Sequence, residues 1–465
     1  MKNPKLQIKP IGIAFSILIL FWVYNYIESN VLFVMGCVLL FCWSFFGDAD
    51  SVFLSILVLI PNVTMIKHLS SPFALLGYAI LIFEYLYIFK VIAKKRRLCF
   101  SAEAFYFLLS AGLTFFFTFS SSYLMSAVRV ISFAFFSYHF FAEKEHRTRA
   151  FYDKMIFAFC LGIASTVVLG VAYWLAMDAD IFVGYFSGIR NDRNYFSATL
   201  SLGVAISVLY IFTSKQKYFT RKYPILVIIM IAGGLLSGSR TFMASLLIPV
   251  FIILGTVLSS QNINKMFILI VIFIGCVFVA VSSERITEII LSTLERFFAG
   301  DMSGGNGRFE TWGIYLKDYA SSVWCILFGK GSEAEIMPKM ETFMATHNTI
   351  IQGLYCGGFF GLVAYFLVYF NLFARLSRHK KLRFIELLPI ADLLLCRFFI
   401  ASYMSDTFSF EALLAFIVAV YRVSGDKEDE SCSNQRHLWS GEYRENSCCY
   451  KRVIDTTEHR EQNII

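Results

Sequence analysis

Long apolar runs, separated by short polar and basic segments, dominate the chain. A helix that crosses the hydrocarbon core of a bilayer needs about 20 mostly apolar residues. By that criterion the pattern predicts about 14 membrane-spanning helices. Their expected limits are 11–27, 31–46, 50–66, 72–93, 103–120, 124–141, 153–176, 195–212, 223–237, 241–258, 266–281, 347–374, 385–403 and 408–421. Because the shortest runs have the length of half-helices, we expect an all-α, polytopic transmembrane helical bundle of about 12–14 spans.

The composition narrows the class of protein. Hydrophobic residues make up 57% of the chain and charged residues 16%. A soluble domain carries more charge than this, so we expect the chain to be dissolved mainly in lipid. The net charge of +8 resides in short clusters between the apolar runs. Such clusters do not form one basic face of a soluble domain, so nucleic acid is not an expected partner.

Cysteines and acidic pairs do not predict a metal centre. Most of the 11 cysteines fall in apolar runs or in the polar tail, and Cys325 alone falls in the long polar loop. Neither a disulfide framework nor a structural zinc site is therefore expected. We interpret Asp178 and Asp180 as solvated loop acids rather than as metal ligands. No metal or other cofactor is expected.

The basic residues also predict an orientation, because they concentrate on the cytoplasmic side of membrane proteins. Lys2, Lys5 and Lys9 place the N-terminus inside, and counting spans places most later basic clusters inside as well. The expected parts are N-terminal transmembrane helices (1–180), central transmembrane helices (181–281), a large extracytoplasmic loop (282–346), C-terminal transmembrane helices (347–424) and a disordered cytoplasmic tail (425–465). The loop carries helix-like stretches at 284–298 and 308–320 around a glycine-rich turn at 303–307. A long ordered loop of this kind is usually functional.

His347 and several arginines are the candidate site residues, since all are expected at the outer surface. His347 opens the span that follows the loop. It either caps a helix or serves as a general base, because imidazole accepts protons at physiological pH. Arg240, Arg308 and the pair Arg190 and Arg193 lie on the same expected side.

Arginine binds phosphate in a bidentate manner, so this group suits a pyrophosphate near the outer leaflet. The alternative is that each arginine snorkels or pairs with a nearby acid, such as Asp192 or Glu310. Arg129 and Arg397 lie within spans, where a charged side chain usually faces a cavity and where snorkelling is again the alternative.

Four segments resemble one known family. His347-Asn348, nine further residues, Gly358, two residues and Gly361 resemble the signature of the O-antigen ligase and O-antigen polymerase superfamily. Ser237-Gly238-Ser239-Arg240 is similar to its arginine-bearing segment, and 306–331 to its large periplasmic loop. The segment 192–196 resembles its acidic-asparagine element, although the family more often has Pro where Arg193 stands. The resemblance covers mainly residues 185–372.

The resemblance implies a GT-C-like bundle in the bacterial inner membrane that transfers a glycan from undecaprenyl pyrophosphate, with inversion and without a metal. Under it, His347 is the base that deprotonates the acceptor hydroxyl. Arg240 and Arg308, with Arg193 as a weaker candidate, hold the pyrophosphate. Asn348, Gly358 and Gly361 support the site. The implied partners are the lipid-linked glycan donor, a glycan acceptor, the lipid bilayer, a flippase and a chain-length regulator.

Three functions remain open at this stage. The leading hypothesis is a polymerase of surface-polysaccharide repeat units. The second is a ligase that moves finished glycan onto a lipid A core or another acceptor. The third, a transporter or flippase, belongs to another class, in which two related halves are common. We find no obvious internal repeat, and the candidate residues gather at one expected surface.

Overall fold

The computed structural model describes residues 8–27, 29–66, 83–90, 92–93, 101–142, 149–182, 185–188, 193–213, 221–259, 267, 270, 274–275, 284–298, 308–339, 345–377, 384–398, 403, 411–415 and 417. These residues form helices and connecting turns, with no strand among them, which confirms the all-α class. All belong to one compact unit, Met1–Arg422. The predicted spans 72–93, 266–281 and 408–421 lie largely outside the described residues, and the turn 303–307, Arg190, Asp192 and the tail 425–465 lie wholly outside them.

The observed helices follow the apolar runs closely. In chain order they are α1 (Ile8–Ile27), α2 (Asn30–Phe46), α3 (Ala49–Ile66), α5 (Ala102–Thr118), α6 (Ser121–Ala142), α7 (Arg149–Ala176), α8 (Arg193–Thr213), α10 (Tyr223–Leu236), α11 (Arg240–Ser245), α12 (Leu247–Ser259), α14 (Glu284–Phe298), α15 (Arg308–Tyr319), α16 (Val323–Phe328), the 3-10 helix η4 (Glu333–Lys339), α17 (Thr349–Ser377) and α18 (Phe384–Phe398). Helices α14 and α15 coincide with the stretches predicted within the long loop.

The predicted span 241–258 is divided in the structure. The run 241–258 forms two helices, α11 and α12, that meet at Leu246. Pro249 has no backbone N–H and cannot donate to the carbonyl of Ser245, so a continuous helix would lose that bond. The predicted span 241–258 is therefore helical over most of its length but carries a turn at Leu246.

Three described helices are long and apolar enough to cross a membrane. They are Phe151–Ala176, Arg193–Ile211 and Thr349–Asn371. Six shorter apolar helices of 10–17 residues accompany them. These helices support association with a lipid bilayer, and the total of about 12–14 spans stays a prediction.

The surface of α2 shows where lipid would lie. Val31, Val34, Val38, Phe41 and Phe45 are each more than half exposed. Their spacing of three or four residues forms one stripe along the helix. Continuous apolar surface of this kind is costly in water and favourable in hydrocarbon, so we interpret the stripe as lipid-facing.

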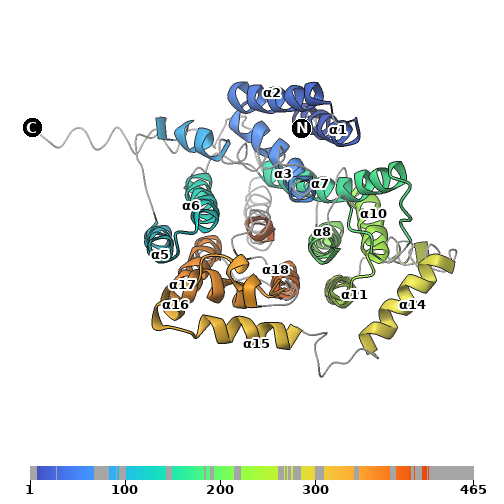
Figure 1. Ribbon diagram of the computed structural model, residues 1–465. Coiled ribbons are helices and arrows are strands. Elements are labelled where there is room, and N and C mark those ends of the chain that lie inside the picture. The colour runs from blue at the N-terminus through green and yellow to red at the C-terminus, as the bar shows by residue number, and fades with distance from the viewer. Residues whose placement is uncertain are drawn as a thin grey trace, which may run out of the picture. The chain divides into compact units, whose positions relative to one another are not determined.

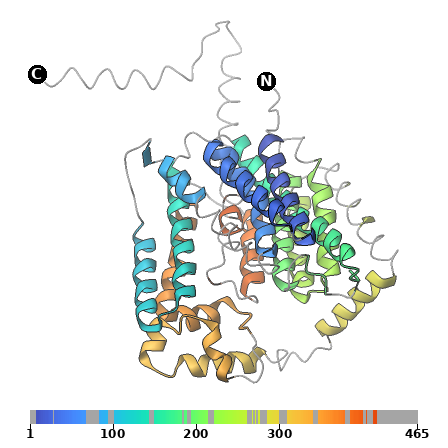
Figure 2. The same cartoon turned by 45° about the horizontal axis from the view of Figure 1, so that its top comes forward.

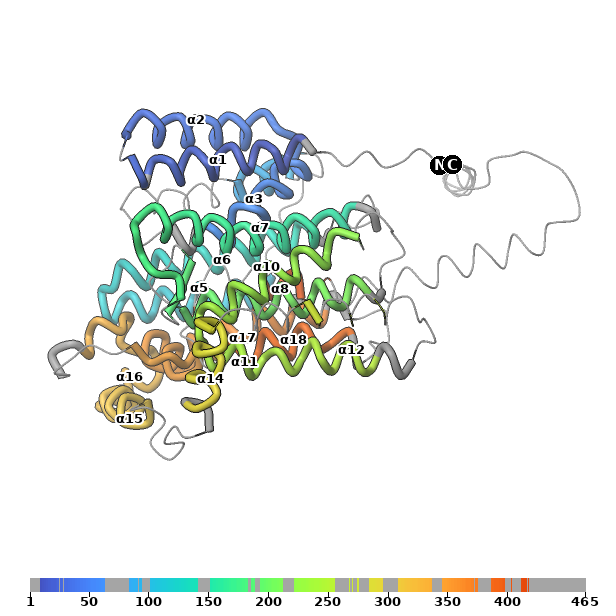
Figure 3. Tube along the Cα trace, turned by 90° about the vertical axis from the view of Figure 1, so that its right-hand side faces the viewer, coloured from blue at the N-terminus to red at the C-terminus, as the bar shows by residue number. Residues whose placement is uncertain are grey.

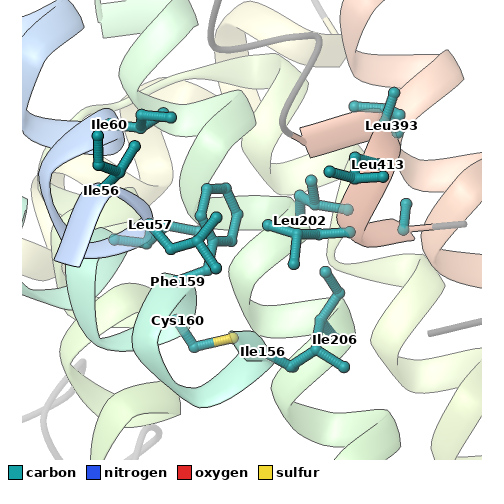
Figure 4. Packing of buried hydrophobic residues seen from close by; sticks show 14 of the residues in the cluster. Ile56, Leu57, Ile60, Ile156, Phe159, Cys160, Leu202, Ile206, Leu393 and Leu413 are labelled. Carbon is teal, nitrogen blue, oxygen red and sulfur yellow. The ribbon is translucent and has the colours of Figure 1, made fainter. Parts of the chain in front are cut away.

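The interior is held together by close helix packing. Side chains from α3, α7, α8, α18 and the helix at 411–415 interleave in the core (Figure 4). Gly162 of α7 lies directly on α3, where an added Cβ would come within 2.7 Å of the carbonyl oxygen of Val58. Asn62 of α3 donates to the carbonyl of Gly162 at 3.2 Å and to Ser165 Oγ at 3.0 Å. Small residues and interhelical hydrogen bonds are the usual means of joining helices in membranes.

The helices of the long loop lie across the others. In Figure 1, α15 runs across the view while α5, α8 and α11 are seen along their axes. Figure 3, turned by 90°, shows α15 along its own axis, with the long helices running across the view. The cyan helices α5 and α6 lie beside the orange helices α16 and α17 in both Figures 1 and 2. Helix α15 also packs against α17, which brings the loop to the start of the span that His347 precedes.

Candidate functional site

Asn348 is the cap that starts α17. Its side-chain Oδ1 accepts hydrogen bonds from the backbone N–H groups of Ile350 (2.9 Å) and Ile351 (3.0 Å). Its backbone carbonyl accepts from Gln352 N at 2.9 Å. The first N–H groups of a helix have no partner within the helix, and Asn is among the residues that best satisfy them. Asn348 therefore fixes where α17 begins, and with it the position of the residue before it.

His347 has a strained backbone and an unpartnered ring nitrogen. Its φ is 43°, in the left-handed region that residues with a Cβ rarely adopt. The ring is half-buried, and its Nδ1 atom is buried without a hydrogen-bond partner among the described residues. Strain and unsatisfied polar atoms are both costly, and both are concentrated at functional sites.

Three contacts from the long loop and α17 hold the segment that carries His347. Trp312 of α15 donates from Nε1 to the carbonyl of Thr346 at 2.6 Å. The N–H of Thr346 donates to Glu333 Oε1 at 3.0 Å, and Gln352 Nε2 donates to Glu333 Oε2 at 2.8 Å. The carboxylate of Glu333 thus joins η4 to both sides of the α17 start. His347 is fixed between three helices rather than carried on a free loop.

Tyr315 packs α15 onto α17 next to this carboxylate. Its ring meets that of Tyr355 edge-on, with centroids 4.8 Å apart. Burial raises the pKa of the Tyr315 phenol, and the negative charge of Glu333 raises it further. Tyr315 therefore stays protonated at physiological pH.

Gly358 breaks α17, and the loop docks into the break. Its φ of 67° and ψ of −174° are not helical. The carbonyls of Tyr355 and Cys356, released by the break, accept hydrogen bonds from the backbone N–H groups of Lys330 (2.6 Å) and Gly331 (2.9 Å). In the family resemblance, Gly329-Lys330-Gly331 and Gly358 belong to separate motifs. The structure brings these two segments into direct contact.

Gly358→Ala should destabilise the protein strongly. A Cβ at this position would overlap the backbone of Leu327 and Phe328, and its φ and ψ belong to a region used almost only by glycine. We expect a loss of about 3 kcal/mol or more in the free energy of unfolding, measured by thermal unfolding in detergent. Gly313→Ala in α15 is the control, since a Cβ there meets nothing within 4 Å. Equal melting of the two variants would contradict the docking role of Gly358.

An ion pair with a buried carboxylate adds to the same junction. Lys330 Nζ lies 3.5 Å from Asp318 Oδ1 of α15, and the Tyr355 hydroxyl donates to Asp318 Oδ2 at 2.8 Å. The Asp318 side chain is 4% exposed. The carboxylate thus has two partners, which a buried charge requires. It links α15, the 329–331 segment and α17.

Gly361 lies one turn beyond the break, where α17 meets two tyrosines. The hydroxyls of Tyr123 and Tyr403 lie 3.2 Å apart. An added Cβ at Gly361 would come within 3.0 Å of the Tyr123 hydroxyl and 3.2 Å of the Tyr403 hydroxyl. Gly361 therefore serves helix packing, some distance along α17 from His347.

Arg240 is the first residue of α11, and the residue before it is tied to α8. Ser239 Oγ accepts from Ser197 Oγ at 2.9 Å and lies 3.4 Å from Asn194 Oδ1, to which it donates. The Arg240 side chain is half-buried. The structure therefore places the two arginine-bearing segments, 193–197 and 237–240, side by side.

Arg193 begins α8 and stacks on an aromatic ring. Its guanidinium carbon lies 4.4 Å from the ring centroid of Tyr185. The ring of Tyr185 therefore fixes the plane of the Arg193 guanidinium at the start of α8.

Arg308 begins α15, four residues before Trp312. Its side chain is half-buried. Because Trp312 is hydrogen-bonded to the residue before His347, Arg308 lies about one helical turn from the anchor of the candidate base. The structure links Arg308 to His347 through this helix.

Arg397 forms a buried ion pair whose partner the sequence analysis missed. Its guanidinium donates to Glu411 Oε2, from Nε at 3.0 Å and also from Nη2. Nη2 donates to Thr199 Oγ1 of α8 at 3.2 Å, and Thr199 Oγ1 donates to Glu411 Oε1 at 2.8 Å. Thr349, the first residue of α17, donates from Oγ1 to the carbonyl of Arg397 at 2.7 Å. The acid within the apolar run 408–421 was the available signal, since an intramembrane acid usually has a cationic partner.

The loop acids at 178 and 180 have the solvated character that we expected. Asp180 accepts from the N–H of Phe182 at 2.9 Å and pairs with Arg285 at 3.5 Å, with both side chains at least half exposed. Within the described residues there is no group of three His, Cys, Asp or Glu side chains arranged to hold a metal ion.

The candidate residues lie along a series of connected segments. The start of α17 contacts α15 through Trp312 and α18 through Thr349, α18 contacts α8 through Arg397, and α8 contacts the start of α11 through Ser197. His347 and Arg240 directly follow residues that make two of these contacts, and Arg193 and Arg308 each lie about one helical turn before such a residue. Comparisons with protein-family models, curated proteins and solved structures find no match for this chain.

Proposed function

We propose that this chain is a membrane glycosyltransferase that moves a glycan from undecaprenyl pyrophosphate to a sugar hydroxyl, and that it polymerises the repeat units of a surface polysaccharide. The proposal rests on His347. Its backbone is left-handed, and its buried Nδ1 has no hydrogen-bond partner in the part of the chain that the structure describes. The loop helix α15 and the cap of α17 hold this residue in place. Such a residue is built to meet a partner that arrives with the substrate.

In the proposed reaction, His347 takes the proton of the acceptor hydroxyl. The acceptor oxygen attacks the anomeric carbon of the donor sugar from the face opposite the leaving group. The bond from that carbon to the pyrophosphate oxygen breaks, and the configuration inverts. Arg240 and Arg308, with Arg193 in a secondary role, would neutralise the charge that develops on the pyrophosphate. This arrangement requires no metal, because guanidinium groups stabilise a developing anion electrostatically.

We also propose the membrane topology that the sequence predicts. The GT-C-like bundle of about 12–14 spans would lie in the bacterial inner membrane with both termini in the cytoplasm. The segment 282–346 would then be extracytoplasmic, and the site would open to the outer leaflet, where the lipid-linked donor arrives. A flippase would supply this donor, and a chain-length regulator would act on the product.

Deletion of the protein from its cells distinguishes polymerase from ligase. A polymerase defect leaves single repeat units on the final acceptor. The proposal of polymerisation fails if polymer still forms on the lipid carrier and does not reach the acceptor, since that result identifies a ligase.

Arg240→Lys tests the contact with pyrophosphate. Lysine keeps the charge but loses the planar pair of donors, so we expect glycan transfer to fall about tenfold or more. The control is Arg285→Lys, because Arg285 forms an exposed ion pair with Asp180 and should tolerate the change. The readout is the rate of product formation by purified protein. Full activity of Arg240→Lys would show that transfer does not depend on bidentate binding of pyrophosphate by Arg240.

A further inference from the structure

A second polar cluster lies where α8, α11 and α18 meet, at the end of α11 opposite Arg240. Ser201 Oγ of α8 lies 2.6 Å from Ser245 Oγ of α11 and 2.7 Å from Asp392 Oδ1 of α18. Ser245 Oγ also lies 2.7 Å from the carbonyl oxygen of Phe242. Asp392 and both serines are buried, and the Asp392 carboxyl is fully so.

The number of protons in this chain of contacts does not balance if Asp392 is ionised. Three oxygen–oxygen contacts of 2.6–2.7 Å each need one proton. The hydroxyls of Ser201 and Ser245 supply two, and a carboxylate supplies none. A protonated Asp392 supplies the third, and the chain then runs in one direction, from Asp392 to Ser201, to Ser245 and to the carbonyl of Phe242.

The charge balance leads to the same conclusion. Arg397 forms a neutral pair with Glu411 and also donates to Thr199. An ionised Asp392 would leave one uncompensated negative charge among buried residues, which is among the most costly arrangements in a protein interior. Its Oδ2 atom is buried without a hydrogen-bond partner among the described residues, which a neutral carboxyl tolerates better than a carboxylate. The distances also argue against a metal cation, because metal ligands rarely approach one another as closely as hydrogen-bonded oxygens do.

We propose that Asp392, Ser201 and Ser245 form a proton-binding site, in which a neutral Asp392 donates into a hydroxyl relay that ends on α11. Because α11 begins with Arg240 and ends with Ser245, the bound proton also helps to fix the helix that presents Arg240. Loss of the proton breaks the relay and leaves a charge in the interior. The other titratable or charged groups on the packed helices are Cys396, Arg397, Glu386, Arg193 and Arg240, together with Glu411 on the neighbouring segment.

Thermal unfolding of the full-length protein in detergent, measured from pH 4.5 to pH 8, tests the site, because a carboxyl that is neutral in the fold and ionised in the unfolded chain loses its stabilising effect between those two pKa values. Stability that depends on a bound proton is complete at low pH and is lost as pH rises. The melting temperature of the wild type should therefore fall by several degrees across this range relative to Asp392→Asn, whose amide is neutral at every pH. The matched control, Asp180→Asn at an exposed carboxyl, should follow the wild type. Parallel curves for wild type and Asp392→Asn would overturn the proposal.

Two further measurements keep the proposal testable if Asp392→Asn does not fold. Once Asp392 ionises, the Ser201 hydroxyl can turn to donate to the carboxylate, and Ser201→Ala removes that stabilisation of the ionised form. The fall in melting temperature should therefore move to higher pH. An unmoved curve would count against the relay. The same unfolding curves are measured with choline chloride or sodium chloride as the buffer salt, at equal ionic strength. The exchange should leave the wild-type melting temperatures unchanged. Stabilisation by sodium would assign the site to a metal cation instead.

Discussion

Replacement of His347 by asparagine or alanine is expected to abolish glycan transfer while leaving the protein folded. A positioned general base typically contributes at least about a hundredfold in rate, and neither substituted side chain accepts a proton at physiological pH. The asparagine variant is the more informative of the two, because asparagine tolerates the left-handed backbone that His347 adopts. It therefore removes the base and leaves the local geometry in place.

The measurement is made in cells that lack their own copy of the protein and carry each variant instead. The ratio of polymer to single repeat units reports transfer, and the amount of protein in the membrane with its melting temperature reports folding. The Asn348 cap and the Trp312 contact remain intact in both variants, so we expect melting close to that of the wild type. If His347→Asn produced as much polymer as the wild type, His347 would not be the general base.

Breaking the buried pair between Arg397 and Glu411 should have the largest effect on stability. Both side chains are almost wholly buried, at 3% and 0% exposure. Arg397→Met leaves Glu411 as an unpaired buried charge, a change that costs about 3–5 kcal/mol in proteins. The same cost is expected for Glu411→Met. Either single variant should melt far below the wild type or fail to accumulate in the membrane.

The double variant Arg397→Met with Glu411→Met distinguishes the penalty for an unpaired charge from the net value of the pair. Replacing both partners with apolar side chains is often neutral in stability, so the double variant should recover most of the loss. Arg285→Met, which breaks the exposed pair with Asp180, should cost less than about 1 kcal/mol. A double variant as unstable as the singles would show that other contacts of these side chains, such as that of Arg397 with Thr199, dominate.

Much of the helical layout could be predicted because spans and caps depend on local residues. The starts of α8, α15 and α17 at Arg193, Arg308 and Thr349 lie within two residues of the predicted boundaries. The split between α11 and α12 depends on Pro249, whose effect competes with a continuous apolar run. Hydrophobic periodicity alone does not resolve that competition.

The contacts of the site depend on tertiary packing and were not predictable in the same way. Nothing in the local sequence of Gly358 shows that its break receives the backbone of Lys330 and Gly331. The partner of Arg397 lies 14 residues away in a different segment, and the Ser201–Asp392 contact joins residues 191 positions apart. Sequence patterns identify which residues are unusual, and only the fold decides which of them meet.

The most direct test of glycan transfer at His347 uses purified protein in detergent. Undecaprenyl-pyrophosphate-linked repeat units serve as both donor and acceptor. We expect longer lipid-linked glycans from the wild type, formed without a sealed bilayer, and none from His347→Asn at equal folded concentration. Equal product from the two proteins, or no product from folded wild type supplied with its native donor, would contradict glycan transfer at His347.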